Sequence, residues 1–265
     1  NMMEQFFARI GRPVLTGLSA LENLGAFIVF HFKLFPYYFL PPYRMGLILR
    51  QIEVIGVQSI GVIALTGSFT GMVLAIQMYQ GFSQFGAESV MGYTIFFSIG
   101  RELGPVFTGL MLISRAVSAM AAELGTMRVT EQIDAIDILS VDSKRYLIVP
   151  RVIAMAISMP ILILLFDVIA NIASFGLATS ALGVNPTQYV DIIKQYLQFG
   201  DYATGMVKGV VFGIVIATIG SYVGYFTNGG AKGVGVATTR AVVIASVALF
   251  LTNYLMSSLF LFVGW

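Results

Sequence analysis

The sequence predicts an all-α membrane protein that crosses the bilayer five times. Of its 265 residues, 57% are hydrophobic and 11% are charged, which leaves too little polar surface to cover a soluble domain of this size. No charged residue occurs between Val54 and Ala87, and about 20 apolar residues are enough for a helix to span a bilayer. Lipid is therefore the expected solvent for most of the chain.

The composition also excludes several kinds of site. A net charge of +2 gives no basic field for nucleic acid. The chain has no cysteine and a single histidine, His31, so disulfide frameworks, cysteine-based zinc sites and cysteine or histidine nucleophiles are excluded. Neither a GxxxxGK[ST] phosphate loop nor an HExxH motif occurs. We expect no metal site, no cofactor and no ATPase activity in this chain.

Residues 1–53 are predicted to lie on the membrane surface. Apolar residues recur at three- and four-residue steps from Phe7 to Leu24, which is typical of an amphipathic interfacial helix. A short soluble helix is the alternative. Pro36 and the Pro41-Pro42 pair are expected to break the helix before the chain enters the bilayer.

Residues 54–265 are predicted to form one domain of five transmembrane helices. The expected spans are Val54–Met78, Val90–Ala121, Val152–Leu182, Val207–Phe226 and Ala241–Val263. The second is longer than a bilayer requires, so we expect it to tilt, bend or protrude. Gly67 and Gly71 in the first span have the GxxxG spacing that permits close helix contact, within the chain or across a dimer.

The distribution of lysine and arginine predicts the topology, because these residues are retained on the cytoplasmic side. Eleven of the fifteen occur in three segments, namely the region up to Arg50, Glu123–Arg151 and Thr227–Arg240. The turn Tyr79–Ser89 has none. The N-terminus is therefore expected inside the cell and the C-terminus outside.

Two connections between spans are predicted to contain helices. On the outer side, Asn185 and Pro186 have the character of an N-cap and a first helical residue, and Gly200 is expected to close that helix. On the cytoplasmic side, polar and apolar residues alternate within residues 123–140 as in an amphipathic helix of about three turns. Such a helix can dock into another protein or remain a solvated loop helix.

Arg101 and Glu102 lie roughly midway along the second span. Because an unpaired charge is costly in lipid, they should face a partner, a cavity or water, and they are candidate cargo-binding residues. Pro105 removes a backbone hydrogen bond next to them, so a kink is expected there. The alternative is that Glu102 only pairs with a basic residue, such as Arg240 or Arg115, to hold helices together.

Several sequence runs resemble the MlaE/YrbE-like permease family of MCE lipid transporters. The runs are RELGP (Arg101–Pro105), SRAVSAMAAELGTMRVTEQIDAI (Ser114–Ile136), VDSKRYLIVPR (Val141–Arg151) and ATTRAVV (Ala237–Val243). GSFTGMVLAIQMY (Gly67–Tyr79) also fits, so the resemblance extends from the first span to the end of the chain.

The resemblance implies a homodimeric ABC permease in the inner membrane of a bacterium with two membranes. A cytoplasmic ATPase would bind ATP and Mg and contact a coupling helix, whose motif is matched by Glu131, Gln132 and Asp134, with Arg128 beside them. An MCE-domain protein would sit on the periplasmic face. The implied cargo is phospholipid or a related lipid, moved between the inner and outer membranes, which maintains outer-membrane lipid asymmetry.

With this resemblance, four residues near the outer end of the first span become candidates for an acyl-chain pocket: Leu74, Ile76, Met78 and Tyr79. We expect two copies to form a cavity between their first, second and fifth spans, with Arg101 and Glu102 near its floor.

Two other classes of function remain open. An ion- or proton-coupled secondary transporter would use Glu102 and Asp167 as a relay, although Asp167 alone is better explained by helix packing. A purely structural membrane anchor for the MCE partner is the third interpretation.

Overall fold

The computed structural model describes residues 22, 25–38, 44–197 and 199–264. No β-strand occurs in this part of the chain. The chain divides into two compact units, residues 1–43 and 44–265. In the first unit, residues 25–34 are helical and the 3-10 turn η1 (Phe35–Tyr38) follows. Most of the predicted interfacial helix, and the Pro41-Pro42 pair, lie outside the described residues.

The second unit confirms five apolar helical segments long enough to cross a membrane. The first combines α2 (Met45–Ile55), η2 (Val57–Ser59) and α3 (Ile60–Ser83). The second contains η3 (Glu88–Val90), α4 (Met91–Ser98), η4 (Ile99–Leu103), α5 (Gly104–Leu112), η5 (Ile113–Val117) and α6 (Ser118–Val129). The last three are α8 (Ser143–Ser180), α10 (Phe199–Tyr225) and α11 (Gly230–Val263).

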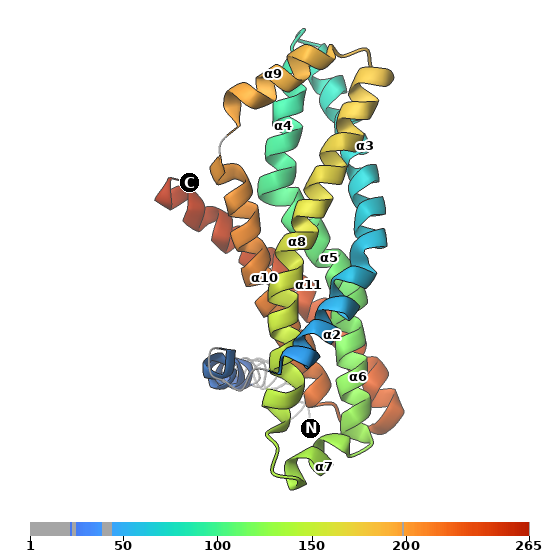
Figure 1. Cartoon of the computed structure of the whole chain (residues 1–265), viewed down its shortest axis with the longest axis vertical. Helices are drawn as coiled ribbons and strands as arrows, with labels where there is room; N and C mark the ends of the chain where they lie inside the picture. Colours follow the sequence, from blue (N-terminus) through green and yellow to red (C-terminus); the bar gives the residue numbers. More distant parts are fainter. Residues whose placement is uncertain (1–21, 23–24, 39–43, 198, 265) are drawn as a thin grey trace, which may run out of the picture. The chain divides into compact units, whose positions relative to one another are not determined.

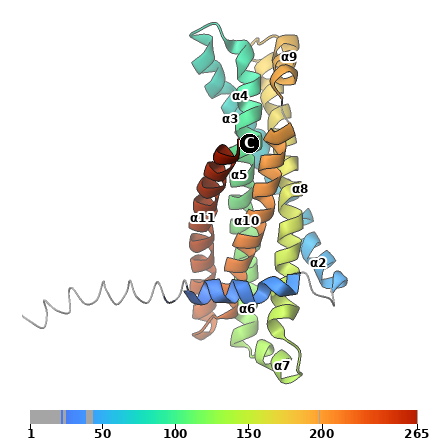
Figure 2. The ribbon, with the colours of Figure 1, turned by 90° about the vertical axis from the view of Figure 1, so that its left-hand side faces the viewer.

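Within this unit, α8 packs between α3 and α10, and α10 also packs against α6 and α11 (Figure 1). The helix α7 (Gln132–Ile138) lies at one end of the bundle, and α9 (Pro186–Tyr196) lies across the other. Turned by 90°, the unit shows α11 along one edge of the bundle (Figure 2). This leaves one side of α11 without a neighbouring helix of the unit.

Most helices are longer than the apolar stretches that predict them. α8 begins at Ser143 and α11 at Gly230, so the predicted loop from Thr227 to Arg240 is mostly helical. Apolar composition marks only the part of a helix that lipid surrounds, whereas backbone hydrogen bonding continues into the polar ends. The second span is 42 residues long, about 60 Å at roughly 1.5 Å per residue, and therefore exceeds a bilayer.

The outer connecting helix begins as predicted. Asn185 Oδ1 accepts hydrogen bonds from the amides of Thr187 (2.9 Å) and Gln188 (3.2 Å), which caps α9. The prediction that Gly200 closes this helix is wrong, because α9 ends at Tyr196 and Gly200 lies inside α10.

The glycines of the first span form the contact between α3 and α8. A methyl group at Gly67 would lie 3.2 Å from the Phe166 carbonyl oxygen, and one at Gly71 would overlap the Ala170 carbonyl group. The GxxxG spacing therefore permits the close contact of two helices within one chain, α3 and α8. Glycine is required here because the two backbones approach too closely for any side chain.

Gly71→Ala tests this contact. We expect it to lower the free energy of unfolding by about 1–3 kcal/mol, because the added methyl group forces α3 away from α8. Gly61→Ala is the matched control, since nothing lies within 4 Å of its added methyl group. Thermal unfolding in detergent compares the two variants, and equal midpoints would contradict the assignment of Gly71 to this contact.

Candidate functional site

A π-helical turn, η4, sets the geometry of the candidate site. The amide of Gly104 donates to the carbonyl of Ile99, five residues earlier. Pro105 has no amide hydrogen, so the carbonyl of Arg101 loses its usual partner four residues later. Beside Pro105, where a kink is expected, the helix forms a π turn. In a membrane helix, a carbonyl group that loses its partner in such a turn needs a hydrogen-bond donor from elsewhere.

Lys208 of α10 supplies the missing donor. Its Nζ donates to the carbonyl of Arg101 (2.8 Å), to Glu102 Oε1 (2.7 Å) and to Ser257 Oγ of α11 (2.8 Å). The side chain is fully buried. Because an ammonium group has three donors, all of its hydrogen-bonding capacity is used, which is what lets a lysine remain inside the bundle.

Glu102 accepts two further hydrogen bonds, both from α11. Asn253 Nδ2 donates to Oε2 at 3.0 Å, and Ser257 Oγ donates to Oε1 at 2.9 Å. The Glu102 side chain is nevertheless 43% exposed in the single chain. The carboxylate is therefore held by α10 and α11, while part of the Glu102 side chain remains accessible.

Arg101 lies beside this carboxylate and pairs with a second acid. Its Nη1 donates to Asp201 Oδ1 of α10 at 3.2 Å, and its guanidinium lies 5.1 Å from the centre of the Phe97 ring. The side chain of Asp201 is 6% exposed, whereas that of Arg101 is 20% exposed. The buried partner fixes the guanidinium, while a fifth of the Arg101 side chain remains exposed.

The cluster of Arg101, Glu102, Asp201 and Lys208 balances two positive charges with two negative ones. Each buried charge has an opposite charge within 3.2 Å, which lowers the cost of keeping both in a medium of low dielectric constant. The exposed part of the cluster presents a guanidinium next to a carboxylate. This arrangement can bind a group that carries a negative charge, or one that carries both signs.

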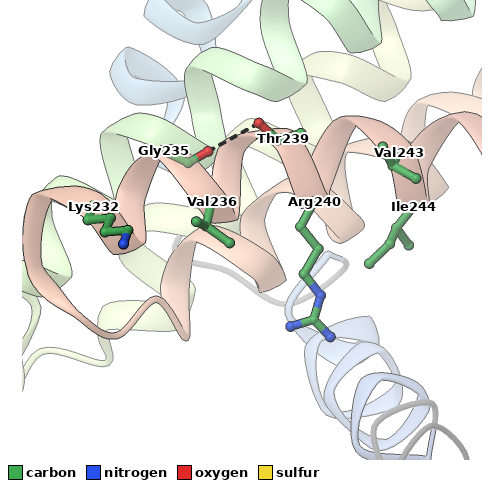
Figure 3. A pocket seen from close by; sticks show the side chains of 7 residues that line it. All are labelled: Lys232, Gly235, Val236, Thr239, Arg240, Val243 and Ile244. Carbon is green, nitrogen blue, oxygen red and sulfur yellow. Dashed lines mark hydrogen bonds between the residues drawn. The ribbon is translucent and has the colours of Figure 1, made fainter.

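Glu102 does pair with a basic residue of another helix, but that residue is Lys208, and the two candidates Arg240 and Arg115 are wrong. Arg240 lies on α11 thirteen residues before Asn253, about 20 Å along the axis at roughly 1.5 Å per residue. It lines a groove of about 730 Å³ on the surface of α11, together with Lys232, Gly235, Val236, Thr239, Val243 and Ile244. Figure 3 shows these side chains along the helix. Arg115 instead donates to Val54, Gln58 and Ser59 of the first span.

Sequence reasoning missed Lys208, Asp201, Asn253 and Ser257. Lys208 lies at the predicted start of the fourth span, where a lysine is ordinarily explained by the adjacent loop. The available signal was Pro105, since the carbonyl that it leaves free requires a donor from another helix.

The four candidate acyl-chain residues lie on α3 and contribute no contact to the charged cluster, which η4, α10 and α11 hold. Ile76 is exposed, and Leu74, Met78 and Tyr79 are half-buried. Helical spacing places Leu74 and Met78 on one face and Ile76 and Tyr79 on another. The single chain therefore does not assemble the four into one pocket.

Asp167 of α8 packs against the end of the π turn, at Gly104. A methyl group at Gly104 would overlap its carboxylate, and its Oδ1 is buried with no hydrogen-bond partner among the described residues. Gly104 thus makes room for Asp167, which supports a packing role for that acid.

The predicted coupling segment is shorter than expected. α6 continues to Val129, and Glu131 adopts a left-handed conformation with φ 59°, so α7 begins only at Gln132 and has seven residues. Arg128 Nη1 donates to Asp134 Oδ1 at 2.6 Å, which braces α7 against the end of α6. Glu131, Gln132 and Asp134 are exposed.

Sequence reasoning missed the most exposed apolar residues of this segment. Ile138 is 82% exposed and Leu139 is 75% exposed, whereas Ile133 is buried against the bundle. Adjacent exposed apolar residues at the tip of a short helix are typical of a protein contact surface. The end of the bundle at α7 can therefore bind another protein.

The chain is similar to a family of membrane permeases. Residues 48–259 match the family model described as Permease MlaE. A probable ABC transporter permease protein from Rickettsia bellii is 44% identical over 239 residues, covering 90% of this chain and 92% of the relative. The intermembrane phospholipid transport system permease protein MlaE from Haemophilus influenzae is 33% identical over 262 residues, covering 97% and 98%. The chloroplastic protein TRIGALACTOSYLDIACYLGLYCEROL 1 from Arabidopsis thaliana is 39% identical over 212 residues, covering 80% and 61%.

Lys208→Met tests the hydrogen-bonding centre of the cluster. We expect the free energy of unfolding to fall by about 2–4 kcal/mol, because Glu102 and the Arg101 carbonyl lose their common donor inside the bundle. Arg240→Met is the control and should change it by less than about 0.5 kcal/mol. Denaturant titration measures both. A larger loss with Arg240→Met would restore the predicted Glu102–Arg240 pair.

Proposed function

The chain belongs to the MlaE permease family, and from that premise we propose that it is the membrane-spanning subunit of an ATP-driven transporter of phospholipid between inner and outer membranes. The names of the relatives support a permease subunit of the ABC type. The name of the Haemophilus relative supports phospholipid as the cargo. This transport would maintain the lipid asymmetry of the outer membrane.

The observation that carries the proposal is the partly exposed pair of Arg101 and Glu102, whose side chains are 20% and 43% exposed in the single chain. A phospholipid headgroup has a phosphate that a guanidinium binds well, and many headgroups add an amine that a carboxylate binds. Lys208 and Asp201 hold the pair from the buried side, so it does not need to reorganise when the headgroup arrives. The charged pair is the proposed headgroup site.

Apolar surfaces next to the pair would hold the acyl chains. α11 exposes a row of large apolar residues: Val243, Val247, Phe250, Leu251, Tyr254 and Leu255. Two copies placed with these surfaces facing each other would enclose a cavity, with α3 and its residues Leu74, Ile76, Met78 and Tyr79 at the border. The proposed assembly is a homodimer whose cavity opens at the α9 end.

The tip at α7 is the proposed contact with a cytoplasmic ATPase, which would bind ATP and Mg. Glu131, Gln132 and Asp134 provide polar contacts there, and Ile138 and Leu139 provide apolar ones. α6 is the last helix of the second span and leads directly into this tip, so movement of α7 would reach the headgroup site.

The proposed orientation places α7 in the cytoplasm and α9 with the C-terminus in the periplasm. Lys144, Arg145 and Arg151 lie near the α7 end, in agreement with the retention of positive residues inside. An MCE-domain protein would sit on the α9 end and exchange lipid with the cavity.

One observation favours a second candidate, an ion- or proton-coupled transporter. Asp167 is a buried acid whose Oδ1 has no hydrogen-bond partner among the described residues, and such acids occur in proton pathways. Glu102, the other acid of this alternative, is already held by Lys208, Asn253 and Ser257. Flux that follows a proton gradient without ATP would support this candidate.

Arg101→Met tests the headgroup site. Proteoliposomes that contain the chain, its ATPase and its MCE partner should lose phospholipid transfer by about tenfold or more, because the phosphate loses a charged hydrogen bond. Transfer of a fluorescent phospholipid measures this. Arg50→Met, at an exposed position on α2, is the control. Unchanged transfer in Arg101→Met would reject the site.

Ile138→Asp tests the ATPase contact. A charge at this exposed apolar position should abolish co-purification of the ATPase, while the chain itself remains folded. Phe85→Asp is the matched control, because Phe85 is equally exposed, at 82%, but lies at the α9 end. Pull-down from detergent extracts compares the two, and retention of the ATPase by Ile138→Asp would place the contact elsewhere.

A further inference from the structure

The first span is interrupted inside the apolar region, between α2 and α3. Two backbone hydrogen bonds close the break, from the Gly56 amide to the Ile52 carbonyl (2.7 Å) and from the Ser59 amide to the Gly56 carbonyl (3.0 Å). The last carbonyl groups of a helix lack regular intrahelical partners, and in lipid they must be satisfied by other donors. The end of α2 therefore depends on side chains.

Arg115 of the second span supplies these donors. Its Nη1 donates to the Val54 carbonyl (3.1 Å) and to Ser59 Oγ (2.7 Å), and its Nη2 donates to Gln58 Oε1 (2.9 Å). Ser59 Oγ in turn donates to the Ile55 carbonyl at 2.5 Å. One guanidinium thus joins the end of α2 to the turn η2, whose last residue, Ser59, is the N-cap of α3.

α8 also contacts the break between α2 and α3, but within the described part of the chain it donates no hydrogen bond from Ser158 there. A methyl group at Gly56 would lie 2.9 Å from Ser158 Oγ of α8, so the two helices are close. Ser158 Oγ is buried and has no hydrogen-bond partner among the described residues. Arg115 therefore provides polar contacts to the break that α8 does not provide.

Arg115 lies in η5, the second π-helical turn of its span. π turns are weak points of helical regularity and are frequent at functional positions. α6 follows η5 directly and leads to α7, whereas α5 and η4 precede it and lead to Arg101 and Glu102. Arg115 thus lies between the proposed ATPase contact and the proposed headgroup site, and reaches across to the first span.

We propose that Arg115 is a positioning residue that latches the break between α2 and α3 and transmits movement of α6 to the first span. With the latch closed, the guanidinium holds α2 in a fixed direction relative to α3. When α6 moves, the guanidinium leaves the break, and α2 turns about Gly56. The inference rests on the proposed function, because it requires a motor acting at α7.

Spin labels can follow this hinge, because the chain has no native cysteine. Labels on Leu49→Cys in α2 and Phe69→Cys in α3 occupy exposed positions on either side of the break. Double electron–electron resonance on the purified complex reports the distance between the two labels of one chain. Labelled chain is diluted with unlabelled chain to suppress distances between copies. We expect one narrow distance without nucleotide and a second distance when ATP is added.

Arg115→Gln should show both distances without nucleotide. Phospholipid transfer should fall by about tenfold, because the break loses its charged hydrogen bonds, while ATP hydrolysis stays within about twofold of wild type. Arg115→Lys should be intermediate, since an ammonium group can reach the carbonyl or the serine but cannot bridge all three acceptors. Arg50→Gln, an exposed arginine of α2, is the control and should match wild type in all three measurements.

Wild-type distances and transfer in Arg115→Gln would overturn the latch. If Arg115→Gln fails to fold, Ser59→Ala removes an acceptor from the other side, and it must show the same second distance to a smaller extent. Absence of ATP-driven transfer in the wild type would instead reject the proposed function. In that case the label distances of wild type and Arg115→Gln without nucleotide still decide whether Arg115 holds the break.

Discussion

The structure depends on the satisfaction of polar groups where no water can reach them. Lys208 is the clearest instance, because one buried ammonium group donates hydrogen bonds both to the carboxylate of Glu102 and to the carbonyl that Pro105 leaves free. This one nitrogen joins three elements, because Lys208 lies on α10 and donates to Arg101 and Glu102 in the π turn and to Ser257 on α11. The charges of Arg101 and Glu102 can remain partly exposed and available to the proposed ligand, because their buried partners stabilise them in place.

The second span combines the functional elements in one continuous path. Its two π turns hold Arg101 and Glu102 at η4 and Arg115 at η5, and its end leads into α7. Each π turn projects charge toward a different neighbour, α10 and α11 in one case and the first span in the other. These contacts connect the second span laterally to the other spans, so movement of the second span can be passed to them as well as along its own axis.

The sequence predicts the five spans and the cap of α9, because apolar length and the Asn185-Pro186 pair are local signals. It also singles out Arg101 and Glu102, since charge inside an apolar segment is visible without any structure. Their partners could not be predicted, because the pairing of Glu102 with Lys208 depends on how distant helices pack. The left-handed backbone of Glu131, which shortens the coupling segment, has no sequence signal such as glycine.

The central claim is that the Arg101–Glu102 pair holds a phospholipid headgroup in an ATPase-driven permease. The most direct measurement is mass spectrometry of the lipids and proteins that remain bound to the gently extracted chain. The account predicts a P-loop ATPase and phospholipid in a fixed ratio to the wild-type chain, with the phospholipid depleted when Arg101 is replaced by methionine. Phospholipid at the wild-type ratio in that variant, or its absence from the wild type, would contradict the account.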